Sequence, residues 1–144
     1  MALDGEYAQE KTGWVSDQLA KIDETGTTDS VAVAGMAVVV FTYRGPKSGK
    51  LYRRPLMRVE HDGAYAAVAS KGGHPEHPEW FHNFVAHPEV DLQDGAEKHP
   101  YRARLVEGEE RAVWWERAVA VYAPYAEYQE KTDREIPVFL LERV

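Results

Sequence analysis

A succession of short apolar segments with glycine-containing turns between them dominates the first half of this sequence. Valine and aromatic residues are concentrated in residues 36–43, which predicts a buried strand. Residues 51–60 and 64–70 are two further predicted strands, and the Asp62-Gly63 pair between them is typical of a tight hairpin turn. We therefore expect an antiparallel three-stranded meander over residues 36–70, which favours a mainly β fold.

The second half predicts helices and a second hairpin. Apolar residues recur at helical spacing in residues 76–87 and 109–121, as they do near the N-terminus in residues 6–22. Residues 90–93 and 101–106 flank Asp94-Gly95 as a hairpin, and residues 136–141 form a last strand. Several short strands with two or three helices favour an α+β fold that is mainly β, either a small antiparallel barrel or a split sheet.

The length of 144 residues fits one domain that is large enough to bury a core. Turn-forming residues 25–30 separate the first helix from the predicted strands, so we expect residues 1–30 to form a helix and linker and residues 31–144 to form the barrel. The helix is expected to pack on the barrel or to cover a site as a lid. Contact with a lipid surface is a weaker alternative, because the helix lacks a polar face rich in lysine and arginine.

Residues 44–58 carry six basic side chains and no acidic one, in a chain whose formal net charge is −7. An acidic chain is a poor general binder of nucleic acid, and no nucleic-acid partner is expected. A local basic turn suits a small anion such as phosphate or carboxylate. The alternative is a solvated hairpin edge whose charge opposes aggregation. The six residues are Arg44, Lys47, Lys50, Arg53, Arg54 and Arg58.

Several chemistries are excluded or disfavoured. The sequence contains no cysteine, which excludes disulfides, thiolate metal sites and a cysteine nucleophile. Four histidines lie between residues 74 and 87, but their spacing does not match a helical ligand pair, so no metal site is expected. No apolar run approaches the ~20 residues of a membrane span, and no signal segment is present. We expect a cytoplasmic protein, with weak membrane association only through the N-terminal helix.

Two further segments suggest a site for a flat ligand. The Ser70-Lys71-Gly72-Gly73 turn contains two glycines, which let a backbone approach a ring closely. Tyr122, Tyr125 and Tyr128 recur around Pro124 on what the proline suggests is an irregular segment. Each phenol needs a hydrogen-bond partner when buried, so these residues suit a pocket wall as well as a core. Ser70 has no evident His–Asp partner, which argues against nucleophilic hydrolysis.

Short motifs succeed one another in a fixed order along residues 36–144. They are Gly45-Pro46-Lys47-Ser48-Gly49-Lys50, Pro55-Leu56-Met57-Arg58-Val59-Glu60-His61-Asp62-Gly63, Val68-Ala69-Ser70-Lys71-Gly72-Gly73, Pro78-x-Trp80-x-x-Asn83 and Tyr125-x-x-Tyr128-Gln129-x-Lys131-Thr132-x-Arg134-x-Ile136-Pro137-Val138. In this order they resemble the deazaflavin-dependent nitroreductase family of actinobacteria, and within it the members that reduce bicyclic nitroimidazole drugs.

The resemblance implies a split β-barrel of the FMN-binding type with Greek-key connections, and the reduced deazaflavin coenzyme F420 as hydride donor. The implied acceptors are quinones, nitroaromatics and activated alkenes, with a menaquinone-like quinone as the natural one. The implied cofactor-binding residues are Lys47, Ser48, Arg53, Arg54, Pro55, Leu56, Met57, Val68, Ala69, Ser70, Lys71, Gly72, Trp80 and Asn83. The implied catalytic residues are Ser70, Tyr125 and Tyr128, and the implied substrate pocket consists of Trp14, Tyr122, Tyr125 and Tyr128.

One position departs from the pattern, and two other functions stay open. Tyr52 stands where a basic residue is expected in close relatives, and Arg53 or Arg54 would take over its contact. The chain is alternatively an FMN-dependent oxidoreductase on the same barrel, or a protein that binds the deazaflavin without turning it over. The basic segment favours the deazaflavin over FMN, because the deazaflavin carries an extended anionic tail.

Overall fold

The computed structural model describes residues 14–32, 36–45, 49–70 and 79–144. The strands within these residues are β1 (Val38–Arg44), β2 (Leu51–Met57), β3 (Glu60–His61), β4 (Ala64–Val68), β5 (Glu89–Asp94), β6 (Glu97–Leu105) and β7 (Val138–Arg143). The helices are α1 (Trp14–Thr25), the short 3-10 helix η1 (Thr28–Ser30), α2 (Glu79–Ala86), α3 (Gly108–Val121) and α4 (Pro124–Glu130).

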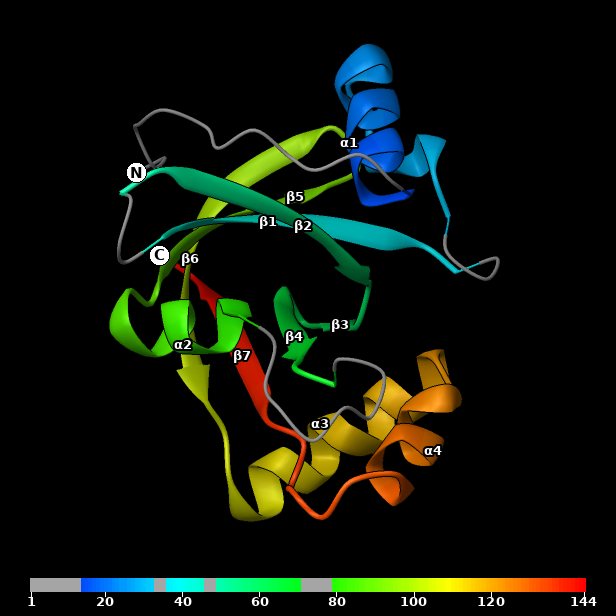
Figure 1. Ribbon diagram of the computed structural model, residues 1–144, viewed down its shortest axis with the longest axis vertical. Coiled ribbons are helices and arrows are strands. Elements are labelled where there is room, and N and C mark those ends of the chain that lie inside the picture. Colours follow the sequence, from blue (N-terminus) through cyan, green and yellow to red (C-terminus); the bar gives the residue numbers. More distant parts are fainter. Residues whose placement is uncertain (1–13, 33–35, 46–48, 71–78) are drawn as a thin grey trace.

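All seven strands of the described residues belong to one sheet with the order β2-β1-β5-β6-β7-β4-β3, and every pairing is antiparallel. The sheet curls so that β1, β2 and β5 lie opposite β4 and β7 (Figure 1). This half-barrel with flanking helices confirms the expected fold class. The hairpins at Asp62-Gly63 and Asp94-Gly95 are also confirmed, and their glycines have φ angles of 82° and 67°, which other residues adopt only with strain.

The expected three-stranded meander is wrong, because residues 51–60 are not one strand. β2 pairs with β1 and β3 pairs with β4, so the two hairpins lie at opposite ends of the strand order. Arg58 and Val59 connect β2 at one end of the strand order to β3 at the other end, and we call these two residues the crossing. The backbone N–H of Arg58 donates to the carbonyl of Ala37 at 3.0 Å, and the carbonyl of Val59 accepts from the N–H of Ala66 at 2.9 Å. The crossing is therefore hydrogen-bonded to both ends of the sheet.

The barrel interior is filled by aromatic side chains from the strands and from α2. Phe41 of β1 is fully buried, and its ring centroid lies 5.3 Å from that of Trp80 and 5.1 Å from that of Phe84. Phe84 also meets Phe139 of β7 at 5.2 Å. These edge-on contacts are the arrangement that aromatic quadrupoles favour. α2 is thus fixed against both halves of the curled sheet.

The outer face of β1 and β2 is covered by α1. Leu19 and Ile22 are buried against Val40, and burying an aliphatic side chain of this size stabilises the fold by about 1.5–3 kcal/mol. Asp23 of the same helix forms a two-fold ion pair with Arg53 of β2, with N–O distances of 2.6 and 2.9 Å. The helix therefore packs on the barrel, one of the alternatives expected for it. No described helix is long and apolar enough to span a bilayer.

A third layer, formed by α3 and α4, covers the outer face of β4 and β7 (Figure 1). Val68 and Leu140 of the sheet pack there with Trp114 of α3 and Tyr125 of α4. The expected irregular segment is confirmed only at Tyr122 and Ala123, because α4 begins at Pro124 and carries the other two tyrosines. Pro124 occupies the first turn of α4, where its missing N–H removes no helical hydrogen bond. Tyr125 and Tyr128 consequently lie on a regular helix, whereas Tyr122 is the extended residue that ends α3.

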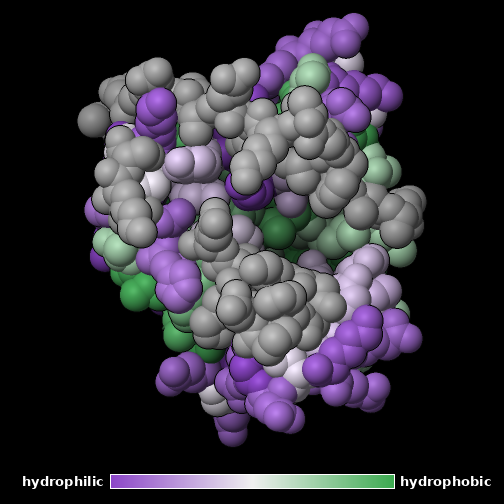
Figure 2. Space-filling view, viewed as in Figure 1, coloured by the Kyte–Doolittle hydropathy of each residue, from purple (hydrophilic) through white to green (hydrophobic). Residues whose placement is uncertain are grey.

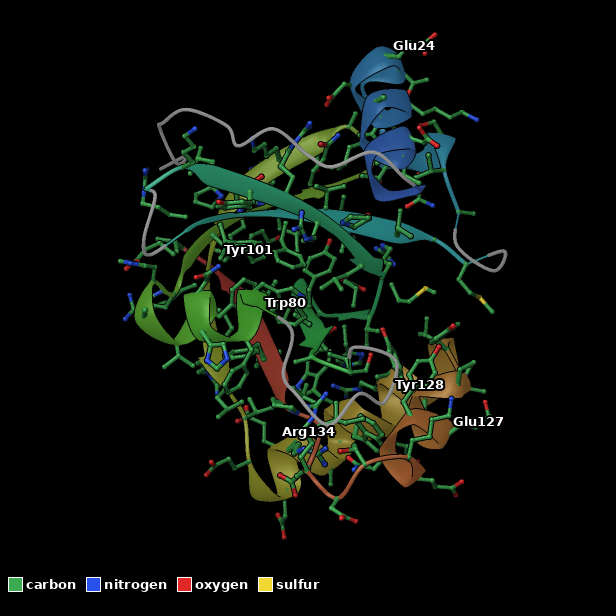
Figure 3. The ribbon with its side chains drawn as sticks, in the orientation of Figure 1. Glu24, Trp80, Tyr101, Glu127, Tyr128 and Arg134 are labelled. Carbon is green, nitrogen blue, oxygen red and sulfur yellow. The ribbon has the colours of Figure 1, made fainter. Side chains whose placement is uncertain are left out.

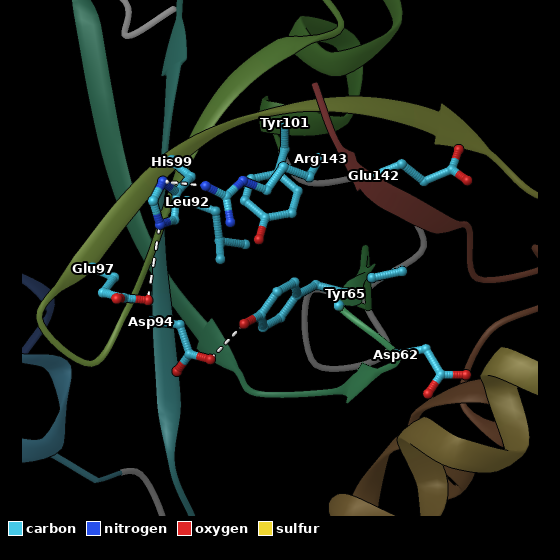
Figure 4. A pocket seen from close by; sticks show the side chains of 11 residues that line it. Asp62, Tyr65, Leu92, Asp94, Glu97, His99, Tyr101, Glu142 and Arg143 are labelled. Carbon is cyan, nitrogen blue, oxygen red and sulfur yellow. Dashed lines mark hydrogen bonds and ion pairs between the residues drawn. The ribbon is translucent and has the colours of Figure 1, made fainter.

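The side chain of Arg58 anchors the crossing. Its Nε donates to both carboxylate oxygens of Asp94 on β5, at 3.0 and 2.9 Å. The hydroxyl of Tyr65 on β4 donates to the same carboxylate at 2.5 Å, and Figure 4 shows the two side chains pointing toward each other. Burial, together with this carboxylate, raises the pKa of Tyr65 well above its ordinary value. One carboxylate therefore joins the crossing to strands from both halves of the barrel.

Replacing Asp94 by alanine should lower the free energy of unfolding by about 2 kcal/mol and the melting temperature by about 5 °C. The loss is smaller than for a fully buried pair, because the Arg58 side chain is 39% exposed. Urea denaturation measures the effect. The matched control is Glu97→Ala, because Glu97 is 83% exposed and contacts only His99 at 3.8 Å among the described ion pairs. Equal stability of the two variants would show that Asp94 does not hold the crossing.

Candidate functional site

Some of the site residues expected from the sequence lie outside the described residues, and the others lie on several different elements. Lys47, Ser48, Lys71 and Gly72 lie outside the described residues, as does the side chain of Trp14. The others lie on β2, at the end of β4, on α2, and on or next to α4. Viewed from the side of α2, the described surface is apolar near the centre and hydrophilic at the upper and lower margins (Figure 2).

Arg53 and Arg54 point to opposite faces of the sheet, because successive side chains of a strand alternate. Arg54 is in register with Phe41, which faces the barrel interior. Arg53 is in register with Thr42 and reaches Asp23 of α1 on the outer face. We therefore expect one bound anion to contact only one of the two guanidinium groups. The interior face is the one that carries α2, so Arg54 is the arginine on the side of the other expected site residues.

Four of the expected cofactor residues on β2 and at the end of β4 are buried. Pro55, Met57, Val68 and Ala69 are buried. Met57 and Val68 belong to the same apolar cluster as Tyr125, whereas Ala69 belongs to the interior cluster with Trp80. Their side chains have no polar atoms to offer apart from the Met57 sulfur. These residues can shape a site and present backbone to it.

Ser70 and Asn83 are two expected site residues with uncharged polar side chains that the structure describes as buried. They are 8% and 7% exposed, and no side-chain hydrogen bond joins either of them to another residue that the structure describes. A hydroxyl and an amide can each donate and accept a hydrogen bond, so both side chains suit the polar edge of a bound molecule. Asn83 lies three residues after Trp80 on α2, a spacing that puts both on one side of a helix.

Tyr122, Tyr125 and Tyr128 form one aromatic cluster. The ring centroids of Tyr122 and Tyr125 are 5.0 Å apart, and those of Tyr125 and Tyr128 are 6.3 Å apart. The hydroxyls of Tyr122 and Tyr128 lie 3.2 Å apart, and this hydrogen bond raises the pKa of Tyr128 to about 12. Burial raises the pKa of Tyr125 well above its usual value. Tyr125 and Tyr128 therefore stay protonated at neutral pH and can act as donors.

The segment after α4 connects the tyrosine helix to Ser70. Nη2 of Arg134 donates to the backbone carbonyl of Ser70 at 2.8 Å. Gln129 of α4 holds the same segment, because its Nε2 donates to the carbonyl of Arg134 at 2.8 Å. Arg134 and Tyr128 lie in the same lower part of the molecule (Figure 3). No sequence pattern indicates the contact between Arg134 and Ser70, since they are 64 positions apart.

Two cavities lie away from Ser70 and the tyrosines, although Arg53 lines one of them. One of about 460 Å³ opens at the end of the barrel by the β5–β6 turn (Figure 4), and another of about 470 Å³ lies under α1. Neither is lined by Ser70, by Trp80 or by the tyrosine cluster. Among the described residues, no group of three or more His, Asp or Glu side chains could hold a metal ion, and His74 and His77 lie outside them.

The family model and the curated relatives that match this chain bear one family name. A model of the F420H(2)-dependent quinone reductase family matches residues 14–143. Rv3178 of Mycobacterium tuberculosis, a candidate F420H(2)-dependent quinone reductase, is 35% identical over 103 residues, which cover 72% of this chain and 87% of the relative. A solved structure of an F420-H2 dependent reductase (FDR-A) is 58% identical, covers 73% of this chain and 93% of its own, and has a TM-score of 0.70. Another, described as a domain-swapped dimer, is 56% identical, covers 90% of this chain and 97% of its own, and has a TM-score of 0.74.

The opposite orientation of the two arginines leads to a prediction. Arg54→Ala should weaken the binding of coenzyme F420 at least about tenfold, because it removes a charge-assisted contact from the interior face. Arg53→Ala should leave that affinity within about twofold, since the Arg53 side chain contacts α1. Titration of F420 fluorescence measures both. Equal losses in the two variants would mean that both arginines contact the cofactor.

The hydrogen bond between Tyr122 and Tyr128 predicts a stability change at alkaline pH. The folded-state pKa of Tyr128 is raised above the unfolded value of about 10, so this contribution is complete below pH 10 and is lost as the pH rises toward 12. In urea denaturation between pH 9 and 12, the wild type should lose stability relative to Tyr128→Phe. Tyr122→Phe, which removes the partner hydroxyl, should flatten the dependence in the same way. Parallel stability curves for all three proteins would contradict the assignment.

Proposed function

Because this chain belongs to the F420H(2)-dependent quinone reductase family, we propose that it reduces quinones with reduced coenzyme F420 as the hydride donor. The observation that supports the proposal is the hydrogen-bonded connection, through Arg134 and Gln129, between Ser70 and the helix that carries Tyr125 and Tyr128. A reductase needs both a surface for the cofactor ring and donors for the reduced acceptor.

The described residues fit the chemistry of coenzyme F420. The cofactor joins a flat ring with polar edges to an anionic tail, and Arg54 on the interior face belongs to a segment without acidic residues. The hydroxyl of Ser70 and the amide of Asn83 are buried without a side-chain hydrogen bond to another described residue, and they would bind the polar edge of the ring. When bound, the reduced deazaflavin supplies a hydride from its C5 carbon.

The tyrosines would hold the acceptor. Reduction of a quinone to a hydroquinone takes up one hydride and one proton, and negative charge develops on a quinone oxygen between the two events. The hydroxyls of Tyr125 and Tyr128 are protonated and can donate a hydrogen bond to that oxygen.

We also propose nitroaromatic compounds and activated alkenes as acceptors, and a menaquinone-like quinone as the natural one. The aromatic cluster of Tyr122, Tyr125 and Tyr128 supports this range, because it offers ring faces and hydroxyls but no fixed charge. A flat acceptor with an oxygen that becomes negative would satisfy those contacts whatever its ring system.

The test mixes purified protein with reduced F420 and a menaquinone analogue, and monitors the absorbance of the oxidised deazaflavin. Oxidation that requires both protein and quinone is the expected result. Tight F420 binding without oxidation by a quinone, a nitroaromatic or an activated alkene would instead identify a cofactor-binding protein. Turnover with reduced FMN in place of F420 would favour the FMN-dependent alternative.

Tyr125→Phe should lower kcat about tenfold while F420 affinity changes less than about twofold, because the hydroxyl is assigned to the acceptor. Ser70→Ala should lower kcat as well. The matched control is Tyr101→Phe, which removes a phenol from the separate cavity of about 460 Å³ and should leave kcat unchanged. If Tyr125→Phe and Tyr101→Phe behave alike, the hydroxyl of Tyr125 does not contact the acceptor.

A further inference from the structure

The two halves of the proposed site are carried by different parts of the chain. Ser70 lies just after β4, whereas Tyr125 and Tyr128 lie on α4 in the outer layer. Packing of α4 on the sheet fixes the tyrosines only from one side. The distance between Ser70 and the tyrosines must therefore also depend on whatever joins the end of β4 to the end of α4.

That junction is the segment 131–137. The backbone N–H of Ala69 donates to the carbonyl of Pro137 at 2.9 Å, and Nη2 of Arg134 donates to the carbonyl of Ser70 at 2.8 Å. Two consecutive residues at the end of β4 are thus bound to the same segment, one by its backbone and one by a side chain. Charge-assisted donation from a guanidinium is the stronger kind of hydrogen bond.

Gln129 fastens the other side of the segment to α4. Its Nε2 donates to the carbonyl of Arg134 at 2.8 Å, and its Oε1 accepts from the backbone N–H of Ile136 at 2.9 Å. Both ends of the amide are used, so the side chain cannot rotate without breaking one bond. Gln129 follows Tyr128 directly in α4. A shift of the segment 131–137 would therefore change the position of the segment relative to Tyr125 and Tyr128.

Arg111 of α3 supports the segment from outside. Its Nη2 donates to the carbonyl of Ile136 at 2.6 Å, and its guanidinium lies 5.0 Å from the ring centroid of Trp115. Desolvation lowers the pKa of Arg134, which means that its place in the fold costs hydration free energy. The hydrogen bond to Ser70 offsets part of that cost.

We propose that Gln129 and Arg134 form a clamp that sets the position of Ser70 relative to Tyr125 and Tyr128. In this role Arg134 and Gln129 are positioning residues, which act through Ser70 and the tyrosines. The clamp controls the rate of hydride transfer and has little effect on how tightly the cofactor binds. This inference rests on the proposed function for its kinetic part, whereas the mechanical part concerns the protein alone.

The rate of hydride transfer depends steeply on the distance between the reacting atoms, and this dependence sets how much rate the loss of the clamp should cost. A misplacement of about 1 Å costs on the order of 100-fold in rate when reacting atoms must meet at van der Waals distance. Loss of one or two hydrogen bonds from a loop would allow a shift of that order. We therefore expect the rate to fall about 10- to 100-fold.

The experiment compares Arg134→Ala and Gln129→Ala with their conservative counterparts. Arg134→Lys retains a charged donor, and Gln129→Glu retains the acceptor for the N–H of Ile136. Both conservative variants should recover part of the hydride-transfer rate that the alanine variants lose. The controls are Arg102→Ala, which removes an arginine that is 65% exposed on β6, and Gln93→Ala, which removes a side-chain bond to Gly95 in a distant turn.

The first readout is amide hydrogen exchange of the protein without cofactor. Arg134→Ala and Gln129→Ala should speed exchange at Ala69 and Ile136 at least about tenfold, while the controls leave both amides unchanged. The second readout is single-turnover oxidation of bound F420H2 by a quinone, with F420 affinity measured in parallel. The alanine variants should lose transfer rate at nearly constant affinity, and the isotope effect of hydride transfer should rise.

The outcomes separately test the existence of the clamp, its effect on hydride transfer and the proposed function. Unchanged exchange at Ala69 and Ile136 would overturn the clamp, whatever the activity. Faster exchange with an unchanged transfer rate would overturn its control of the reaction. A wild-type protein that oxidises no F420H2 would refute the proposed function, and the exchange data would still decide whether the clamp exists. If an alanine variant fails to fold, the comparison of Arg134→Lys and Gln129→Glu with wild type supplies the same test.

Discussion

The carboxylate of Asp94 holds the place where the chain crosses from one end of the curled sheet to the other. It binds Arg58 of the crossing and the hydroxyl of Tyr65 on β4, while Asp94 itself belongs to β5. β2 and β4 are separated by four strands in the sheet order. Both strands belong to the proposed site, and the crossing that connects them is held by this carboxylate together with two backbone hydrogen bonds.

The candidate site lies where two apolar layers meet. One layer is the barrel interior, which includes Trp80 and Ala69, and the other is the packing of α3 and α4 on the sheet, which includes Val68 and Tyr125. Because Val68 and Ala69 are adjacent in the chain, the end of β4 belongs to both layers. A ligand held there would be supported from the cofactor side by the barrel and from the acceptor side by the helices.

Local features of the fold were predictable, and long-range ones were not. The Asp-Gly pairs indicated both tight hairpins, because few other residue pairs adopt those turns. The break at Arg58 and Val59 was missed, since residues 51–60 are strand-like throughout and only the distant pairing partners end β2 there. α4 was missed because Pro124 was taken as a helix breaker, although a first turn tolerates it.

The same limit applies to the site. The opposite directions of Arg53 and Arg54 result from strand alternation, but the sequence does not say which face is the interior. The tyrosines were recognised from their spacing and their need for hydroxyl partners. Arg134 had no such signal, because its importance comes from a contact with a residue far away in the chain.

The strand order also affects how this protein reaches its native state. The hairpins β1–β2 and β5–β6 join neighbouring segments and can form within ~1–10 μs. β1 must still pair with β5, and β4 must pair with β7, where Val68 is in register with Val138 near the C-terminus. Non-local pairing of this kind is associated with folding over milliseconds to seconds, because loop-closure entropy is lost before the contacts form. Ser70 and the segment that holds it are therefore assembled late in folding, after most of the chain has already collapsed.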